Sequence, residues 1–280
     1  MTSPTRIVTS VTVLMWFDGS AEAVGTLPVA RKIARVMEGS LHLVLSSESG
    51  EARERLSLLT PQEAEARLHE LIGNPALGIV RLATFNPGAY IVAPAYGPSR
   101  PETGLGLVAE EILRRAECPV LIVQPSTAYS SWKLDRILVP QDGTADAARA
   151  LCPATRLAER SGAEVLVLHV SPERSAAAPR PGVMECPFYV DQPQHEWPSW
   201  VSAFVERVRH LCRMSPHALL RFHWASGDPG REILALARRK RVDLITMSWT
   251  RREEPGRPQV VRQVLREAPC PILILPGALS

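Results

Sequence analysis

The chain has 280 residues, of which 45% are hydrophobic and 22% are charged, a composition typical of globular proteins and not of disordered or fibrous chains. Its 32 lysines and arginines outnumber its 29 aspartates and glutamates by only three, so no global positive field predicts binding to nucleic acid or to an anionic membrane. The five cysteines are widely spaced and form no CxxC pair, so they predict neither a disulfide framework nor a zinc motif.

The first element that the sequence predicts is a buried strand near the N-terminus. Thr and Ser interrupt the apolar stretch in MTSPTRIVTSVTVLMWFDGS, and Asp18 ends it, which is typical of a strand rather than of a signal peptide. No run approaches the roughly 20 apolar residues that span a bilayer. We therefore expect a cytoplasmic protein.

The two halves of the chain repeat one another. VLMWFDGSAEA (13–23) recurs as ILVPQDGTADA (137–147), and ILRRAECPVLIVQP (112–125) recurs as VLREAPCPILILPG (264–277). Two further pairs lie between these anchors in the same order: residues 38–46 match 161–169, and 89–95 match 242–248. Four matched pairs in one order indicate a tandem duplication. We predict a first repeat over residues 1–125, a linker over 126–134 and a second repeat over 135–280.

Short apolar runs rich in Val, Ile and Leu alternate with longer amphipathic stretches in each half. This alternation is typical of a parallel sheet with helices on both faces, so we predict two tandem α/β domains with five strands each. Thr144 and Asp228-Pro229 are good helix starts. In the second repeat we expect helices over 144–160, about 195–213 and 228–240, and strands near 135–140, 163–170, 217–225, 242–249 and 271–275.

The repeats differ in length. Asp18 and Asp142 are 124 residues apart whereas Cys118 and Cys270 are 152 apart, so the first repeat is 28 residues shorter. We predict that it lacks about one helix, because GIVRLATF reads as a strand and Asn86-Pro87-Gly88 is too short for a parallel crossover. A hairpin or irregular edge over 78–95 would follow. Alternatively, a helix over 61–72 takes the missing role and an earlier strand has been lost.

These features together resemble the universal stress protein family, as a tandem pair. The resemblance rests on an apolar strand followed by Asp-Gly-Ser, the strand GAEVLVLHV, a helix opened by Asp-Pro, the strand VDLI, and a closing APCPILI. It implies a flavodoxin-like or adenine-nucleotide-hydrolase-like sheet in each repeat, with the repeats paired through their last strands. It also implies a stress-response factor rather than a metabolic enzyme.

Many members of this family bind ATP at the carboxyl ends of the strands. They use the Asp after the first strand and a motif of Gly, two residues, Gly, about nine residues, Gly and Ser or Thr. Glycines let backbone N–H groups approach phosphates, and the helix N-terminus that follows favours negative charge. By this resemblance Asp18 and Asp142 match the acidic position, although both also fit as turn residues at strand-to-helix junctions.

The glycine motif is degenerate in both repeats. In the first repeat Gly97 and Gly106 fit the second and third glycines, but Pro94 replaces the first and Leu107 replaces the hydroxyl residue. In the second repeat no glycine is kept: the corresponding positions are Ser248, Arg251 and Pro258-Gln259. Proline removes an N–H donor, and leucine offers no hydroxyl to a phosphate. The resemblance makes ATP the one candidate cofactor.

Two basic segments have competing interpretations. Arg251 and Arg252 lie where phosphates would sit and are candidates for binding an anion, but Glu253 and Glu254 follow them and favour a solvated loop. The run over residues 238–241 falls at a predicted helix end, where cations complement the helix dipole, so we do not expect it to bind nucleic acid.

Other chemistry-bearing residues carry no recognisable site. Cys186, His195, His210 and Cys212 fit no zinc spacing, so we expect no metal. The sequence contains no nucleophile elbow, HExxH or P-loop, and therefore no visible carrier of catalysis. His169 ends a core strand and reads as a structural histidine. The Pro-rich loop over 171–194 is long enough to act as a lid near Asp142 or as a partner surface.

We therefore expect a non-enzymatic protein with a stress-response or regulatory role. The alternative is an ATP- or AMP-binding sensor, or a slow ATPase, that uses Asp18, Gly97 and Gly106. For partners we expect the two repeats to form an internal pseudo-dimer, two chains to form a homodimer, and an unidentified protein to bind, with neither nucleic acid nor membrane involved.

Overall fold

The computed structural model describes residues 11–58, 66–98, 101, 104–125, 127–171, 202, 204–206, 212, 219–249 and 257–276. The first repeat alternates strands with helices throughout. Its elements are β1 (Thr12–Trp16), α1 (Ala21–Val36), β2 (Ser40–Ser46), α2 (Gly50–Ser57), β3 (Arg67–Leu71), α3 (Pro75–Thr84), β4 (Tyr90–Pro94), α4 (Leu107–Arg115) and β5 (Val120–Val123).

The second repeat follows a short 3₁₀ helix, η1 (Thr127–Ser131), and has the same alternation. Its described elements are β6 (Arg136–Gln141), α5 (Ala145–Arg149), α6 (Leu151–Ser161), β7 (Glu164–Ser171), β8 (Leu220–Ser226), α8 (Pro229–Lys240), β9 (Leu244–Trp249), α9 (Arg257–Glu267) and β10 (Ile272–Pro276). All five strands lie close to the ranges that the sequence predicts.

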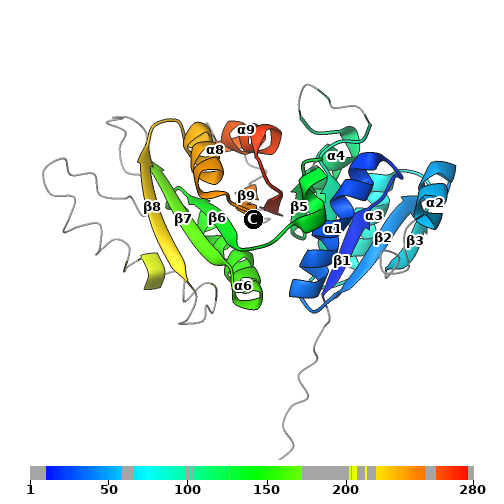
Figure 1. The fold of residues 1–280 in the computed structure, drawn as a ribbon, viewed down its shortest axis with the longest axis horizontal. Coiled ribbons are helices and arrows are strands. Elements are labelled where there is room, and N and C mark those ends of the chain that lie inside the picture. Colours follow the sequence, from blue (N-terminus) through cyan, green and yellow to red (C-terminus); the bar gives the residue numbers. More distant parts are fainter. Residues whose placement is uncertain are drawn as a thin grey trace, which may run out of the picture.

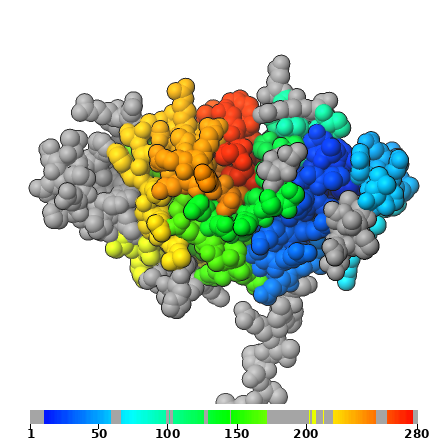
Figure 2. Space-filling model, in the orientation of Figure 1, coloured from blue at the N-terminus to red at the C-terminus, as the bar shows by residue number. Residues whose placement is uncertain are grey.

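A single ten-stranded sheet runs through both repeats in the order β3-β2-β1-β4-β5-β10-β9-β6-β7-β8. Every neighbouring pair is parallel except β5 and β10, which pair antiparallel with Leu121 opposite Leu273. The repeats therefore join through their last strands, as the resemblance implies. Figure 1 shows the two halves facing each other across this junction, and Figure 2 shows them as one elongated body.

Helices cover both faces of the sheet and enclose two apolar cores. One core lies under α1, α2 and α6, and the other lies under α3, α4, α8 and α9. Alternate residues of each strand enter opposite cores: Leu14 packs on the α3 side and Met15 on the α1 side, and both are fully buried. The tandem α/β fold predicted from the sequence is confirmed.

The first repeat has the helix that the sequence led us to consider missing. Residues 78–85, predicted as a strand, belong mostly to α3, which connects β3 to β4 as a parallel crossover. The hairpin or irregular edge over 78–95 is therefore wrong. The alternative helix over 61–72 is wrong as well, because residues 67–71 form β3. Asn74 accepts a hydrogen bond from the Leu77 N–H at 3.0 Å, and Pro75 occupies the first turn of α3.

The missing 28 residues lie in a different connection. Residues 47–66 link β2 to β3, a stretch of 20, whereas residues 172–219 link β7 to β8, a stretch of 48. The difference of 28 accounts for the whole length difference between the repeats. Ser171 ends β7, and the rest of the predicted 171–194 loop and most of the predicted helix over 195–213 lie in this longer connection, outside the described residues.

The predicted helix over 144–160 is divided into α5 and α6. Thr144 caps α5 as expected, accepting a hydrogen bond from Ala147 N–H at 3.2 Å. The helix is interrupted at Ala150, which is the C-cap of α5 and the N-cap of α6. Pro153 lies in the first turn of α6, where its lack of an N–H donor is tolerated. Asp228 caps α8 by accepting from Arg231 N–H at 2.8 Å, and this helix start is confirmed.

The segment between the repeats packs against both of them. Tyr129 and Leu134 are buried. The Trp132 indole N–H donates to the carbonyl oxygen of Asp243 at 3.1 Å, which ties the segment to the start of β9. The domain boundaries at residues 125 and 135 stay a prediction.

One disulfide connects α6 to a later segment of the second repeat. Cys152 and Cys212 are 60 residues apart in sequence, and their Cα atoms are 4.7 Å apart. The cysteine spacing did not predict this pair. Cys270 is a buried free thiol, as expected for a small apolar residue at a strand start. Cys118 is also a free thiol, and burial raises its pKa to about 12.

Among the helices in the described part of the chain, none has the length and apolar character needed to cross a membrane.

Candidate functional site

Asp18 lies directly after β1, at the carboxyl edge of the first repeat's strands. Its Oδ1 accepts hydrogen bonds from the Ser20 N–H at 3.0 Å and from the Ser20 hydroxyl at 2.6 Å. The Ser20 hydroxyl oxygen in turn accepts from the Ala23 N–H at 3.1 Å and caps α1. Asp18 thus holds the residue that starts the helix.

Asp142 makes the same turn in the second repeat. Its Oδ1 accepts from the Thr144 N–H at 3.0 Å and from the Thr144 hydroxyl at 2.6 Å. Both aspartates therefore serve as turn residues, in agreement with one of the two interpretations of the sequence. Each keeps a second carboxylate oxygen outside this turn.

Gly97 and Gly106 bring the first repeat's candidate residues together. A Cβ on Gly97 would lie 3.3 Å from Asp18 Oδ2, so these residues meet at the carboxyl ends of β1 and β4. Gly106 is the N-cap of α4, and no side chain among the described residues caps this helix start. The positive end of the α4 dipole therefore faces the same edge of the sheet.

Local packing also accounts for Gly106. Its N–H donates to the Ala95 carbonyl oxygen at 2.7 Å, and an added Cβ would lie 3.2 Å from Tyr96 Cα. The chain itself therefore comes close to this glycine where a side chain would stand. Gly97 is less restricted, since among the described residues, apart from its chain neighbours, only Asp18 lies within 4 Å of its missing Cβ.

The residues around this cluster fit a nucleotide only in part. Pro94, at the end of β4, offers no N–H group, and Leu107, with 87% of its surface exposed, places no hydroxyl at the start of α4. The first turn of α2 packs on the turn after β1: a Cβ on Gly19 would lie 2.7 Å from the Ala52 N and Cα atoms. The first repeat therefore keeps the acidic residue and two glycines, without the complete phosphate cradle.

The second repeat has a buried polar pair near Asp142 that the sequence did not reveal as a pair. His169 Nδ1 donates to the carbonyl oxygen of Gln141 at 3.1 Å, and the Gln141 amide donates to the carbonyl of Ala147 at 2.8 Å. Burial lowers the pKa of His169, while the Gln141 carbonyl and Asp142 act in the opposite direction. His169 is thus a buried, hydrogen-bonded histidine, as its position in a core strand indicates.

Comparison with known proteins shows the family of the chain. The sequence model of the universal stress protein family matches residues 13–124, 133–185 and 216–276. The chain belongs to the universal stress protein family. Comparison with curated proteins gives no match.

Solved structures of similar fold cover nearly the whole chain of this universal stress protein. A universal stress protein from Archaeoglobus fulgidus DSM 4304 is 18% identical with a TM-score of 0.65, and the match covers 95% of this chain and 98% of that one. A putative universal stress protein from Pseudomonas aeruginosa UCBPP-PA14 is 16% identical with a TM-score of 0.63, covering 97% and 94%. At these identities the likeness shows the shared tandem fold.

Several of the remaining candidate site residues of this universal stress protein lie outside the described residues. Ser248 is buried at the carboxyl edge of β9. Arg251 and Arg252 lie outside the described residues, and so do Cys186, His195 and His210. Cys212, which was considered with these three residues as a metal ligand, forms a disulfide with Cys152. Within the described ranges, no three His, Cys, Asp or Glu side chains are grouped closely enough to hold a metal ion.

Proposed function

We propose that this universal stress protein has a non-enzymatic stress-response or regulatory role in the cytoplasm and that it acts by binding a protein partner. The observation that carries the proposal is how the polar side chains at the carboxyl edge of the sheet are used. Asp18 and Asp142 build helix starts, and His169 bonds a backbone carbonyl. These contacts support a structural use of the residues that would otherwise be candidates for acid–base chemistry.

Exposed apolar side chains in the first repeat support the partner. Six of the eight large hydrophobic side chains exposed in the described part of the chain belong to this repeat, and Ile72, Phe85 and Leu107 have 71–88% of their surfaces exposed. Ile72, Leu77 and Phe85 lie just before, within and just after α3, and large exposed apolar surfaces are typical of interaction sites. The outer strands β3 and β8 are sheet edges, which supports a homodimer as a further association.

The test compares a surface variant with a site variant in a cell-survival assay under stress. Ile72→Ser/Phe85→Ser removes the exposed apolar groups and should abolish the protective effect of the protein. Asp18→Asn keeps an oxygen for the turn and should leave protection unchanged, because Asn supports the same turn. The opposite pattern, with protection lost only in the Asp18 variant, would overturn the proposal.

A second candidate is nucleotide binding at the first repeat. Two features favour it: the Asp18 carboxylate lies beside the position of a Cβ on Gly97, and α4 begins at Gly106. Isothermal titration with ATP or AMP and magnesium should give no micromolar binding to the wild-type chain. Pro94→Gly/Leu107→Ser, which restores two motif positions, should bind ATP more tightly than the wild type. Micromolar binding by the wild type would support this second candidate instead.

A further inference from the structure

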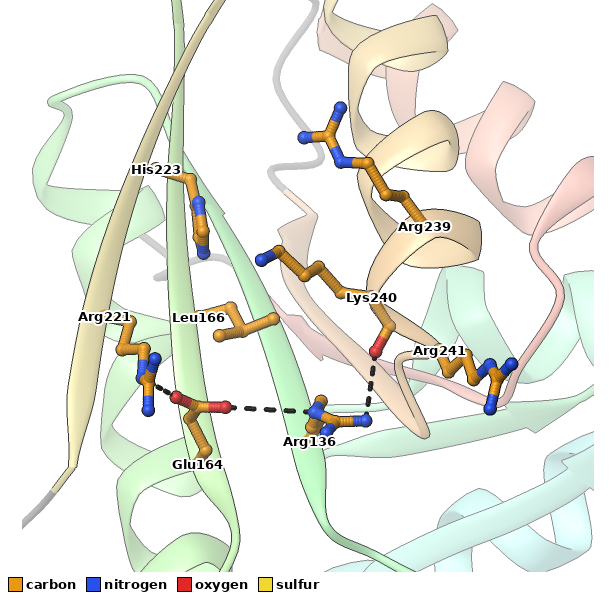
Figure 3. A pocket seen from close by; sticks show the side chains of 8 residues that line it. All are labelled: Arg136, Glu164, Leu166, Arg221, His223, Arg239, Lys240 and Arg241. Carbon is orange, nitrogen blue, oxygen red and sulfur yellow. Dashed lines mark hydrogen bonds and ion pairs between the residues drawn. The ribbon is translucent and has the colours of Figure 1, made fainter.

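A basic cavity lies at the amino edge of the second repeat's strands, opposite to the edge that carries Asp142. Its volume is about 420 Å³, and it is bounded by the starts of β6, β7 and β8 and by the C-terminal end of α8 (Figure 3). The charged side chains that line it are Arg136, Arg221, Arg239, Lys240 and Arg241, with Glu164 as the one carboxylate. We call this cavity the α8 pocket.

The strand residues reach the α8 pocket because strand side chains alternate between the two faces of the sheet. Leu166 belongs to the core under α8 and forms part of the cavity wall. Glu164 precedes it by two residues in β7 and therefore points to the same face. Arg221 pairs in register with Leu166 across β7 and β8, and Arg136 pairs with Glu164 across β6 and β7.

The single carboxylate does not balance the cations. Glu164 forms an ion pair with Arg221, and its other oxygen lies 3.8 Å from Arg136 Nε. Arg136 also donates to the carbonyl oxygen of Lys240, the last residue of α8, at 3.2 Å. Among the described residues that line the pocket, five cationic side chains against one carboxylate leave a surplus of four positive charges. The Asp243 carboxylate lies beside the Arg136 backbone but does not line the pocket. The helix dipole offsets only about half a charge at the C-terminus.

The fold does not require this cluster. The corresponding helix of the first repeat, α3, has one basic residue in its last turn, Arg81, whereas the last turn of α8 has three. The first strand residues at this edge also differ: β1 begins with Thr12, whereas β6 begins with Arg136. Among the described residues, the positions of the first repeat that are equivalent to Arg136 and to the last turn of α8 therefore carry fewer cations.

His223 adds a polar group that has no partner among the described residues. Its Nε2 atom is buried and forms no hydrogen bond with the described residues. Figure 3 shows its ring and the Lys240 ammonium group extending toward the same space beside Leu166. Burial, followed by the charges of Lys240 and Arg239, lowers the pKa of His223. A negatively charged ligand would reverse the effect of those charges.

We propose that the α8 pocket binds a small anion with two or more phosphate groups, such as inorganic triphosphate or the phosphate tail of a nucleotide. Guanidinium groups bind phosphate oxygens through paired hydrogen bonds, and a surplus of four charges matches a multivalent anion better than a single phosphate. The volume lies within the usual range of small-molecule sites, roughly 300–1,000 Å³. This inference goes beyond the proposed function and does not depend on it.

Isothermal titration of the full chain with inorganic triphosphate tests the pocket. Binding should be stronger at about 50 mM than at about 200 mM NaCl, because salt screens the charges. Lys240→Gln should weaken it about tenfold, the loss expected when a charged hydrogen bond is removed. Arg238→Gln is the matched control, since it removes the same charge from the same helix turn but does not line the cavity. It should leave the affinity within about twofold of the wild type.

A second readout is the titration of His223 by NMR, with its signals assigned from the His223→Gln variant. Saturation with triphosphate should raise the His223 pKa, and Lys240→Gln should reduce that effect. An ATP arm identifies the source: tighter binding of ATP than of triphosphate indicates a nucleotide, and equal binding indicates the inorganic anion. The proposal is overturned if triphosphate does not bind, or if Arg238→Gln and Lys240→Gln weaken triphosphate binding equally. It is also overturned if only polymeric nucleic acid binds.

Discussion

Replacing Gly19 with alanine tests whether α2 packs on the turn that carries Asp18. Gly19 has φ +86°, and an added Cβ would lie 2.7 Å from Ala52 backbone atoms. The left-handed conformation costs an alanine about 1–2 kcal/mol. Ordinary carbon contacts need about 3.5–4.0 Å, so α2 must also move, which costs about 1–3 kcal/mol in a packed region. The two effects together should lower the free energy of unfolding by about 2–5 kcal/mol.

Gly73→Ala is the matched control. Gly73 has nearly the same φ, +84°, but an added Cβ would meet no described residue within 4 Å. It should therefore show only the conformational cost of about 1–2 kcal/mol. Urea unfolding followed by tryptophan fluorescence measures both variants against the wild type. Equal losses for Gly19→Ala and Gly73→Ala would refute the contact between α2 and the first turn.

Three further changes test other parts of the fold. Cys212→Ser opens a loop of 60 residues closed by the bond to Cys152 and should lower the free energy of unfolding by up to about 4 kcal/mol; an unchanged value in non-reducing buffer would contradict the disulfide. The pKa of His169 is lower in the folded than in the unfolded chain, so the unfolded chain binds a proton at a higher pH. The stability that His169 contributes should therefore be complete above about pH 6.5 and decrease as the pH falls below that value. A His169→Gln variant should show a flatter pH dependence of the free energy of unfolding in urea. Trp132→Phe removes the hydrogen bond to the Asp243 carbonyl and should cost about 1 kcal/mol, measured by thermal unfolding; no change would indicate that this bond does not hold the linking segment.

The order of strands and helices could be predicted wherever the sequence had strong local signals. Asp228-Pro229 predicts the start of α8, and Asn74-Pro75 is the equivalent start of α3, with Asn in place of Asp. The eight apolar-rich residues of GIVRLATF are too few for periodicity to separate a strand from a helix. Ile79 and Ala83, both buried and four residues apart, show the helical spacing only once the helix start at Asn74 is recognised.

The candidate sites divide in the same way. The meeting of Asp18 with Gly97 could be anticipated, because both positions follow from one family motif. The α8 pocket could not, since Arg136, Arg221 and Lys240 come from three different elements and β6 lies far in sequence from β8 and α8. Their meeting depends on strand register and on the position of α8, and no local pattern encodes either. The disulfide likewise depends on a contact between residues 60 positions apart.

The antiparallel pairing of β5 with β10 has a consequence for how the two halves can change over time. In a symmetric dimer of identical chains every substitution appears twice, once on each side of the axis. Here the two partners of that pairing are parts of one polypeptide, so each can acquire a substitution independently while the tether keeps them together at any dilution. The α8 pocket can then form in one half, while the other half keeps Asp18 and its two glycines. Covalent linkage thus permits a division of labour that identical subunits cannot have.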